Sequence, residues 1–524
     1  MEALDGIEDA TPRRDEGEIL GRDAVMEHEA PELTKINSVG FDLNRFEELV
    51  GDVPNDFEAW TSLIAHVEKA HPNDIERICL IYDAFLSEYP LCYGYWNKYA
   101  NHKAQLCTLH DVEEIYERAV LAVPYSVDIW VKYCSFGVLT YEDPMDIRRL
   151  YERGLSFVKK DYFCHQLWDK YIEYEYSIQQ WSQLAHLHIR TLVFPTKKLQ
   201  SYYERKLQDA AATAYHLLIG KSISLLLKLA IPISSLSPVV FKKLVDIWSQ
   251  KMGCQQDLEL PRESIPLSQG MTDIKDNEYL EISNLIKEFM DQKGDHSKIA
   301  FRKYLSLGNQ LYNRSRQIDE KICCFEAHIR RRYFHLKPLD ACQIDNWHQY
   351  LDFAEMQGDF DWTVKLYERC LIACASYSEF WVRYVEFMDA NGGREIANDA
   401  LGRALTIFLK RVPAFHIYSA MFKEKIGDFS AARILVKQGL DLGSDFIGTV
   451  KKLANMEKRL GNTEVACQTY EKAIELAKEN KNLDIIPILY YCFAQFTFVV
   501  SLLELCCHVF HIFIVFLFFF FYLG

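Results

Sequence analysis

The sequence of 524 residues predicts an all-α protein, an α-solenoid in which helix pairs stack into two arrays. Three observations support this prediction. Tryptophans recur at nearly even intervals, a Tyr-Glu-Arg tripeptide follows three of them at a nearly constant distance, and glycine and proline are scarce. The interval, about 35 residues, is typical of stacked helix pairs, because one pair has two apolar faces and buries both only against its neighbours.

The first helix of each unit is marked by a tryptophan. Four of these follow one another almost evenly in the N-terminal half, and two repeat the same interval in the C-terminal half. A tyrosine stands three positions after five of them, so that both rings lie on one stripe of a helix. We expect these rings to pack between helices: Trp60, Trp96 with Tyr99, Trp130 with Tyr133, Trp168 with Tyr171, Trp347 with Tyr350, and Trp381 with Tyr384.

The second helix carries its own signature, at a nearly constant distance after the tryptophan. A small residue follows each copy and allows the first helix to approach closely. Prolines such as Pro90 and Pro124 end the second helix, and Gly358-Asp359 and Gly427-Asp428 predict the turn between the two helices of a unit. The three full copies are Tyr116-Glu117-Arg118, Tyr151-Glu152-Arg153 and Tyr367-Glu368-Arg369.

The repeats divide the chain into five parts. Residues 41–195 form the predicted N-terminal array and residues 301–484 the C-terminal array. Between them, residues 196–300 break the period and predict an irregular helical linker. Residues 1–40 are acidic and lack aromatic side chains, which predicts a disordered lead-in. Residues 485–524 form a hydrophobic tail.

Charge argues against collection of nucleic acid by the whole molecule. The net charge is −15, but the first 50 residues hold 14 acidic and 5 basic side chains, so the remainder carries only −6. A nearly neutral body has no global field for phosphates, and we expect contact with RNA to be indirect or weak. The 15 cysteines include no C-x-x-C pair, which favours reduced thiols in an intracellular protein.

The tail allows two interpretations. From Ile485 to Gly524 the one formally charged residue is Glu504, and Leu505–Leu523 is long enough to span a membrane. No basic residue flanks that stretch, and the repeat pattern that begins at Ile485 stops before it is complete. Phenylalanine codons contain only pyrimidines, so the run of Phe resembles a translated polypyrimidine tract. We expect an aberrant segment, a retained intron or a misassigned exon, rather than a membrane anchor.

The sequence offers no catalytic, cofactor-binding or metal site. Gly220-Lys221-Ser222 has the end of a phosphate-binding loop, but Tyr215 stands where its first glycine should be. Neither H-E-x-x-H nor G-x-S-x-G occurs. The basic run Arg330-Arg331-Arg332 fits either a solvated helix face or a contact with a phosphate or an import factor. We therefore expect no enzyme.

The Trp-x-x-Tyr helix followed by Tyr-Glu-Arg, a small residue and a proline resembles the half-a-TPR (HAT) repeat, a relative of the tetratricopeptide unit. Within that family, Phe41–Ile64 and Trp347–Phe387 are similar to members that act in splicing with the U1 small nuclear ribonucleoprotein (U1 snRNP). The resemblance implies a nuclear scaffold that binds U1 snRNP protein subunits. It also implies a homodimer or paralogue heterodimer through the C-terminal array.

The resemblance further implies that the tryptophans anchor helix packing and that the glutamate and arginine of each signature are polar pairs of the second helix. The main hypothesis is a splicing scaffold that takes part in 5′ splice-site recognition. Two alternatives remain: a HAT scaffold of mRNA 3′-end cleavage and polyadenylation, and a tail-anchored membrane adaptor.

Overall fold

The computed structural model describes residues 57–205, 276–290, 295–442, 445–479 and 484–502. These residues form helices and short connections, without a β-strand among them, which confirms the all-α prediction. The N-terminal helices are α2 (Phe57–Ala70), α3 (Ile75–Glu88), α4 (Tyr93–Leu106), α5 (Leu109–Ala122), α6 (Val127–Thr140), α7 (Pro144–Val158), α8 (His165–Ser177) and α9 (Trp181–Arg190).

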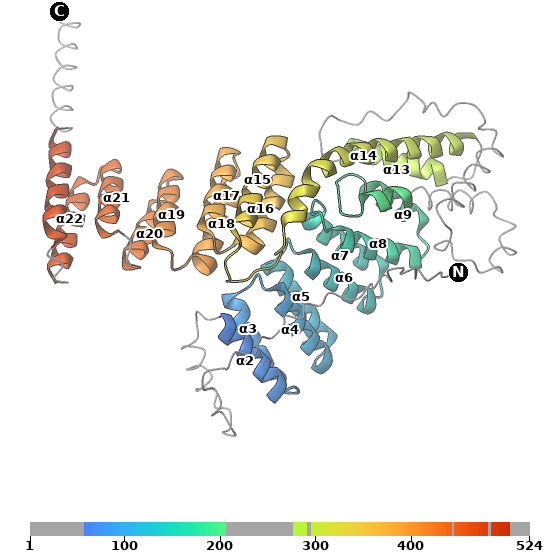
Figure 1. Ribbon diagram of the computed structural model, residues 1–524, viewed down its shortest axis with the longest axis horizontal. Helices are drawn as coiled ribbons and strands as arrows, with labels where there is room; N and C mark the ends of the chain where they lie inside the picture. Colours follow the sequence, from blue (N-terminus) through green and yellow to red (C-terminus); the bar gives the residue numbers. More distant parts are fainter. Residues whose placement is uncertain (1–56, 206–275, 291–294, 443–444, 480–483, 503–524) are drawn as a thin grey trace, which may run out of the picture. The chain divides into compact units, whose positions relative to one another are not determined.

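The helices further along begin with two that precede the C-terminal repeats, and a helix at residues 486–502 follows the last of them. Consecutive helices lie side by side as pairs (Figure 1). The helices are α13 (Asp276–Met290), α14 (Asp295–His328), α15 (Ala341–Gln357), α16 (Phe360–Cys374), α17 (Ser378–Ala390), α18 (Arg394–Arg403) with the π-turn η3 (Ala404–Phe408), α19 (Pro413–Lys425), α20 (Phe429–Asp441), α21 (Phe446–Arg459) and α22 (Thr463–Glu479).

Local sequence explains where the helices begin and end. Asp359 accepts a hydrogen bond from the backbone N–H of Trp362 at 2.9 Å and so caps α16. Gly358, just before it, has a φ of 73°, a left-handed conformation that ends α15 without a steric penalty on a side chain. Gly427 and Asp428 repeat this arrangement between α19 and α20.

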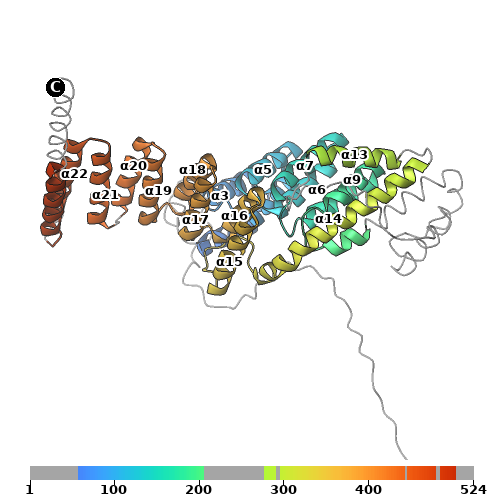
Figure 2. The ribbon, with the colours of Figure 1, turned by 90° about the horizontal axis from the view of Figure 1, so that it is seen from above.

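The described part of the predicted linker is packed helix. Helix α14 lies along α13, and α13 contacts α9, the last helix of the N-terminal pairs (Figures 1 and 2). The Tyr304 hydroxyl donates to the Ala185 carbonyl at 3.1 Å, and the Ser315 hydroxyl donates to the Leu192 carbonyl at 2.6 Å. The predicted boundary at residue 300 therefore falls inside α14, since a single continuous helix has no period to break. Residues 1–40 and 206–275 lie outside the described residues.

The first part of the predicted tail continues the array. Leu489, Cys492 and Phe496 lie on one face of the helix at 486–502 and are buried against Tyr470 of α22. Leu505–Leu523, the stretch with membrane-spanning length, lies outside the described residues. Among the residues that the structure describes, no helix combines the length and hydropathy that a membrane span requires.

The N-terminal and C-terminal pairs are joined by buried charges. The Lys160 ammonium, with only 1% of its side chain exposed, lies 2.9 Å from Asp359 and 3.1 Å from Asp361 of α16. Next to it, the Asp161 carboxylate lies 3.1 Å from the Arg369 guanidinium. Charges this deep require close partners, so the contact fixes the α7–α8 connection against α16.

Candidate functional site

The tryptophan anchors lie buried beneath arginines of the second helix. All six side chains are at most 4% exposed, and a guanidinium carbon lies 5.1–5.8 Å from the ring centroid of five of them. Such cation–π contacts strengthen as the ring is shielded from water. The pairs are Arg118 over Trp96, Arg153 over Trp130, Arg190 over Trp168, Arg369 over Trp347, and Arg403 over Trp381.

The indole N–H of these rings connects one unit to the one before it. The Nε1 of Trp96 donates to the Pro90 carbonyl at 2.8 Å, and that of Trp130 donates to the Pro124 carbonyl at 2.7 Å. Trp381 makes the same bond, at 2.8 Å, to Ala375. The acceptor lies six positions earlier each time, so the residue after the preceding second helix supplies a carbonyl that this helix leaves free.

Aromatic stacks cross the same boundary. The aromatic residue of one second helix stacks on the tyrosine that follows the tryptophan in the next unit. Ring centroids lie 4.5–5.2 Å apart and ring planes lie within 24° of parallel. The stacked pairs are Tyr82 with Tyr99, Tyr116 with Tyr133, Tyr151 with Tyr171, Phe325 with Tyr350, and Tyr367 with Tyr384.

The acidic and basic residues of the signature pair between units. Glu117 binds Arg153 of the next unit at 2.6 Å, not its own neighbour Arg118, because adjacent residues on a helix point in different directions. The expectation of polar pairs within one second helix is corrected accordingly. The pairs, at 2.6–2.7 Å, are Asp83–Arg118, Glu117–Arg153, Glu152–Arg190, Glu326–Arg369 and Glu368–Arg403.

We call each such set a rung: an aromatic stack, a carboxylate, and an arginine over a tryptophan. The carboxylate also accepts from the stacked tyrosine, as when the Tyr133 hydroxyl donates to Glu117 at 2.5 Å and that of Tyr384 to Glu368 at 2.8 Å. The hydrogen bond from Arg153 lowers the pKa of Glu117 below its ordinary value. Every rung therefore joins two successive units by packing and by charge.

Small residues behind the signature make room for the tryptophan. Gly154 faces Trp130, and a Cβ atom placed there would come within 3.1 Å of the indole ring. Ala119 and Cys370, at the corresponding positions, are fully buried. The close approach of the two helices in a unit thus depends on this position.

Sequence reasoning missed four members of the rungs. Asp83 and Glu326 lie in incomplete signatures, Tyr82-Asp83-Ala84 and Phe325-Glu326-Ala327, which lack the arginine. Arg190 and Arg403 lack the preceding Tyr-Glu. The signal that would have found these two arginines is their distance from Trp168 and Trp381, which equals the distance from Trp96 to Arg118.

The rungs stop in the units formed by α19 to α21. His416 takes the place of the tryptophan, because its Nε2 lies 3.0 Å from the Lys410 carbonyl six positions earlier. Other ion pairs connect these helices, between Arg433 and Glu457 and between Arg459 and Glu424. The Arg433 hydrogen bond lowers the pKa of Glu457.

The basic run at 330–332 is partly used within the fold. The Arg332 guanidinium lies 3.5 Å from the centroid of Phe163, and Arg331 donates to the Lys337 carbonyl at 2.6 Å. Arg330 has 79% of its side chain exposed and reaches Asp340 only at 4.0 Å. Packing thus accounts for Arg331 and Arg332.

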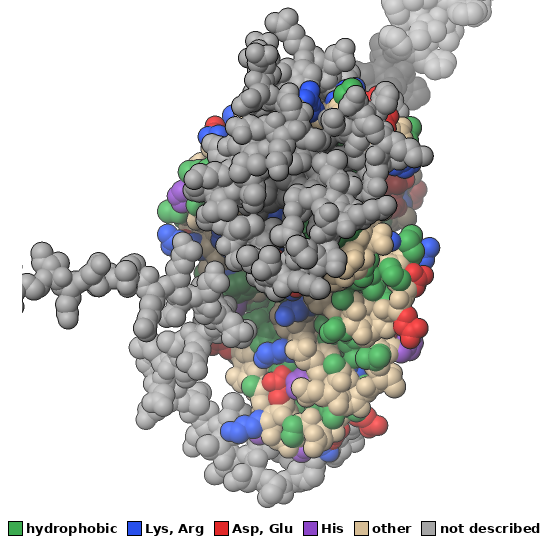
Figure 3. Space-filling model, turned by 90° about the vertical axis from the view of Figure 1, so that its right-hand side faces the viewer, with side chains coloured by type: hydrophobic (Ala, Val, Ile, Leu, Met, Phe, Trp, Pro, Cys, Tyr) green, Lys and Arg blue, Asp and Glu red, His purple; other side chains and the backbone are tan. Residues whose placement is uncertain are grey.

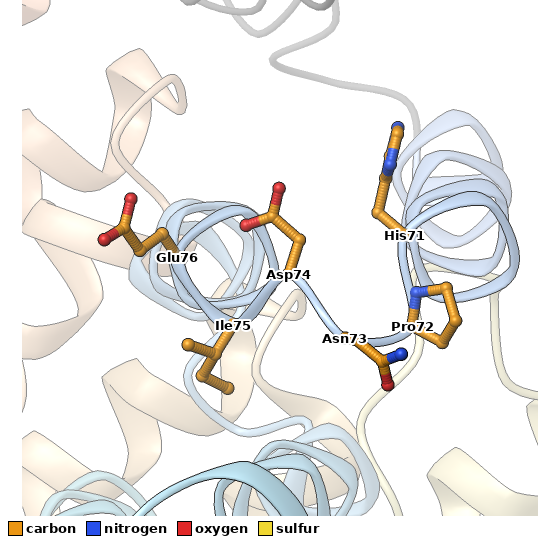
Figure 4. A pocket seen from close by; sticks show the side chains of 6 residues that line it. All are labelled: His71, Pro72, Asn73, Asp74, Ile75 and Glu76. Atoms are coloured by element: carbon orange, nitrogen blue, oxygen red, sulfur yellow. The ribbon is translucent and has the colours of Figure 1, made fainter.

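The surface depressions do not have the character of an active site. The largest lies at the open turn between α2 and α3, lined by residues 71–76, where the His71 and Asp74 side chains face solvent (Figure 4). Both side chains bind Arg77, at 3.1 and 2.9 Å. In the part of the chain that the structure describes, no cluster of His, Cys, Asp or Glu could hold a metal ion.

The fold and the rungs define a helical-repeat protein whose conspicuous polar residues hold its units together. Two family models match, the PRP39 N-terminal HAT repeat over residues 44–208 and the PRP39 C-terminal HAT repeat over residues 320–459. Together they match more than half of the chain, which belongs to the PRP39 family of HAT-repeat proteins.

Curated relatives agree with the family models. The chain is 45% identical to pre-mRNA-processing factor 39-2 of Arabidopsis thaliana over 489 residues, 92% of this chain and 44% of that protein. It is 28% identical to human pre-mRNA-processing factor 39 over 83% of this chain and 61% of that protein. For the Schizosaccharomyces pombe protein the identity is 29%, over 75% of this chain and 59% of the relative. The chain thus spans about half the length of these relatives.

A further match concerns a different RNA-processing step. The mRNA 3′-end-processing protein rna14 of Aspergillus oryzae is 28% identical over 136 residues, which is 24% of this chain. That similarity is far shorter than those to the factor 39 proteins.

Proposed function

We propose that this chain is a non-catalytic scaffold in pre-mRNA splicing that binds protein subunits of the U1 snRNP in the nucleus and supports 5′ splice-site recognition. The observation behind the proposal is the pair of PRP39 matches, which cover both arrays and coincide with the rungs. A stack held by repeated contacts offers long surfaces to proteins, and such surfaces are how helical-repeat proteins bind their partners.

The use of the arginines supports protein partners over RNA. The five rung arginines each bind a carboxylate and cover an indole ring, so their charge is neutralised within the fold. On the face in Figure 3, acidic and basic side chains are interspersed among the described residues and form no field of one sign. Contact with RNA is therefore proposed to be weak or to occur through bound proteins.

Pairing with another chain is part of the proposal. The expected assembly is a homodimer or a paralogue heterodimer through the C-terminal array. Sedimentation of the purified chain at several concentrations tests for the homodimer. Co-expression with a paralogue tests for the heterodimer.

The decisive experiment is affinity capture of the tagged chain from nuclear extract, with and without nuclease. We expect U1 snRNP proteins in both samples, because protein contacts hold the complex. Recovery of cleavage and polyadenylation factors alone would contradict the proposal in favour of 3′-end processing. Loss of all partners on nuclease treatment would show that RNA provides the contact.

A further inference from the structure

An incomplete rung lies at the far end of the described array. Tyr470 of α22 stacks on Phe493, with centroids 5.3 Å apart and planes at 21°, as the aromatic pairs do in the complete rungs. Glu471 follows Tyr470, as Glu117 follows Tyr116 and Glu368 follows Tyr367. The aromatic stack and the carboxylate of a rung are therefore in place.

The tryptophan position of this rung is Tyr490. In each complete rung the tryptophan lies three positions before the stacked tyrosine, and Tyr490 lies three before Phe493. Tyr490 is 49% exposed, whereas the six tryptophan anchors are at most 4% exposed. Among the described residues no guanidinium covers its ring; the Lys478 ammonium lies 5.8 Å from the centroid.

The missing component is the arginine. The distance from Trp96 to Arg118, counted on from Tyr490, leads to Ile512, and residues 482–524 contain neither Lys nor Arg. Glu471 is exposed and has no ion pair with another described residue. The site therefore offers an anionic group and an aromatic face without the cation that the other rungs hold there.

An apolar stripe extends from this site along the same helix. Tyr491, Phe498 and Leu502 recur at helical spacing and are 63%, 68% and 49% exposed. They lie on the face opposite Leu489, Cys492 and Phe496, which are buried against α22. In the complete units, the second helix of the same pair covers the face that this stripe corresponds to.

We propose that this end of the array is a docking site for an amphipathic helix of another protein that carries an arginine. The arginine would bind the Glu471 carboxylate and lie over the Tyr490 ring, and the apolar side of that helix would cover Tyr491, Phe498 and Leu502. The five internal rungs specify this occupant, because each fills the equivalent site with an arginine from a helix. The proposal is independent of a role in splicing.

The probe is a peptide of residues 143–159, which contains α7 and supplies Arg153 to a complete rung, added to the full chain. A matched peptide carries Arg153→Gln. By fluorescence anisotropy we expect the arginine peptide to bind at least about tenfold more tightly, as charge-assisted hydrogen bonds do. Glu471→Gln in the chain should abolish that preference, and Glu471→Arg should reverse it toward a peptide with Arg153→Glu.

The control is Glu475→Gln, an exposed glutamate one turn further along α22, which should leave binding unchanged. Circular dichroism of each variant verifies that the helices are retained. Absence of binding, equal binding of the two peptides, or an equal effect of Glu475→Gln would overturn the proposal. Self-association of the unmodified chain that Glu471→Gln disrupts would also overturn it, since a second copy would then be the occupant.

Discussion

Trp130 illustrates how much one side chain does in this architecture. It is fully buried, lies beneath the Arg153 guanidinium, donates its N–H to Pro124, and packs against the backbone of Gly154. Packing within its own unit and a hydrogen bond to the preceding unit thus converge on one ring. The two contributions are separable, because phenylalanine keeps much of the first and loses the second.

We predict that Trp130→Ala lowers the free energy of unfolding by about 3–5 kcal/mol, the usual cost of removing a buried aromatic ring. Trp130→Phe should cost less, since it retains an aromatic ring although it loses the hydrogen bond. Urea unfolding followed by circular dichroism measures both. Equal losses for the two variants would mean that the hydrogen bond, rather than packing, dominates.

Glu117 makes the stability of its rung depend on pH. Its pKa in the folded state lies below the ordinary value of 4.5, because Arg153 stabilises the carboxylate. The ionised form therefore stabilises the fold at pH above 4.5, and this stabilisation is lost as the pH falls through the lowered pKa. We predict that melting temperature falls less steeply on acidification in Glu117→Gln than in the unmodified chain. Parallel curves across the acidic range would contradict this prediction.

The rung is the element that joins one helix pair to the next. Glu117 and Arg153 come from α5 and α7, 36 residues apart, and Tyr133 of α6 binds the same carboxylate. A residue pair within α7, Asp146 and Arg149, is also an ion pair at 2.7 Å but is largely exposed. Comparison of the two separates the contribution of a rung from that of an ordinary surface pair.

A double-mutant cycle tests this difference. We predict a coupling energy of about 1–3 kcal/mol between Glu117→Gln and Arg153→Gln, within the range for residues in one hydrogen-bonded network. The cycle of Asp146→Asn and Arg149→Gln should give about 0.5 kcal/mol or less. Chemical unfolding of the four variants and two double variants provides the values. Similar couplings would contradict a special role for the rungs.

In the whole molecule, buried charges join pairs that are distant in sequence. Lys160 reaches Asp359 across 199 residues, Arg369 binds Asp161, and Lys410 binds Glu88 at 2.6 Å. Removing Lys160 would leave Asp359 partly buried without this counter-charge. The N-terminal and C-terminal helix pairs are therefore expected to unfold together rather than as independent stacks.

We predict that Lys160→Met lowers the free energy of unfolding by about 3–5 kcal/mol, the range for breaking a buried ion pair on one side. It should also separate a single melting transition into two, with protease cleaving one array before the other. Lys170→Met, which removes an exposed pair with Glu173, serves as the control. Two transitions in the unmodified chain would contradict coupling through Lys160.

The sequence by itself determined the helices, their pairing and the buried tryptophans. These follow from local rules: a helical stripe places Trp130 and Tyr133 on one face, and the recurring period predicts stacking. It did not reveal that Glu117 pairs with Arg153 rather than Arg118, nor that Asp83, Glu326, Arg190 and Arg403 complete the rungs. Only the tertiary structure decided these pairings and the contact of Lys160 with Asp359. The reason is physical: partners of charged groups depend on which helix faces meet, and the stacking of whole helices sets that geometry.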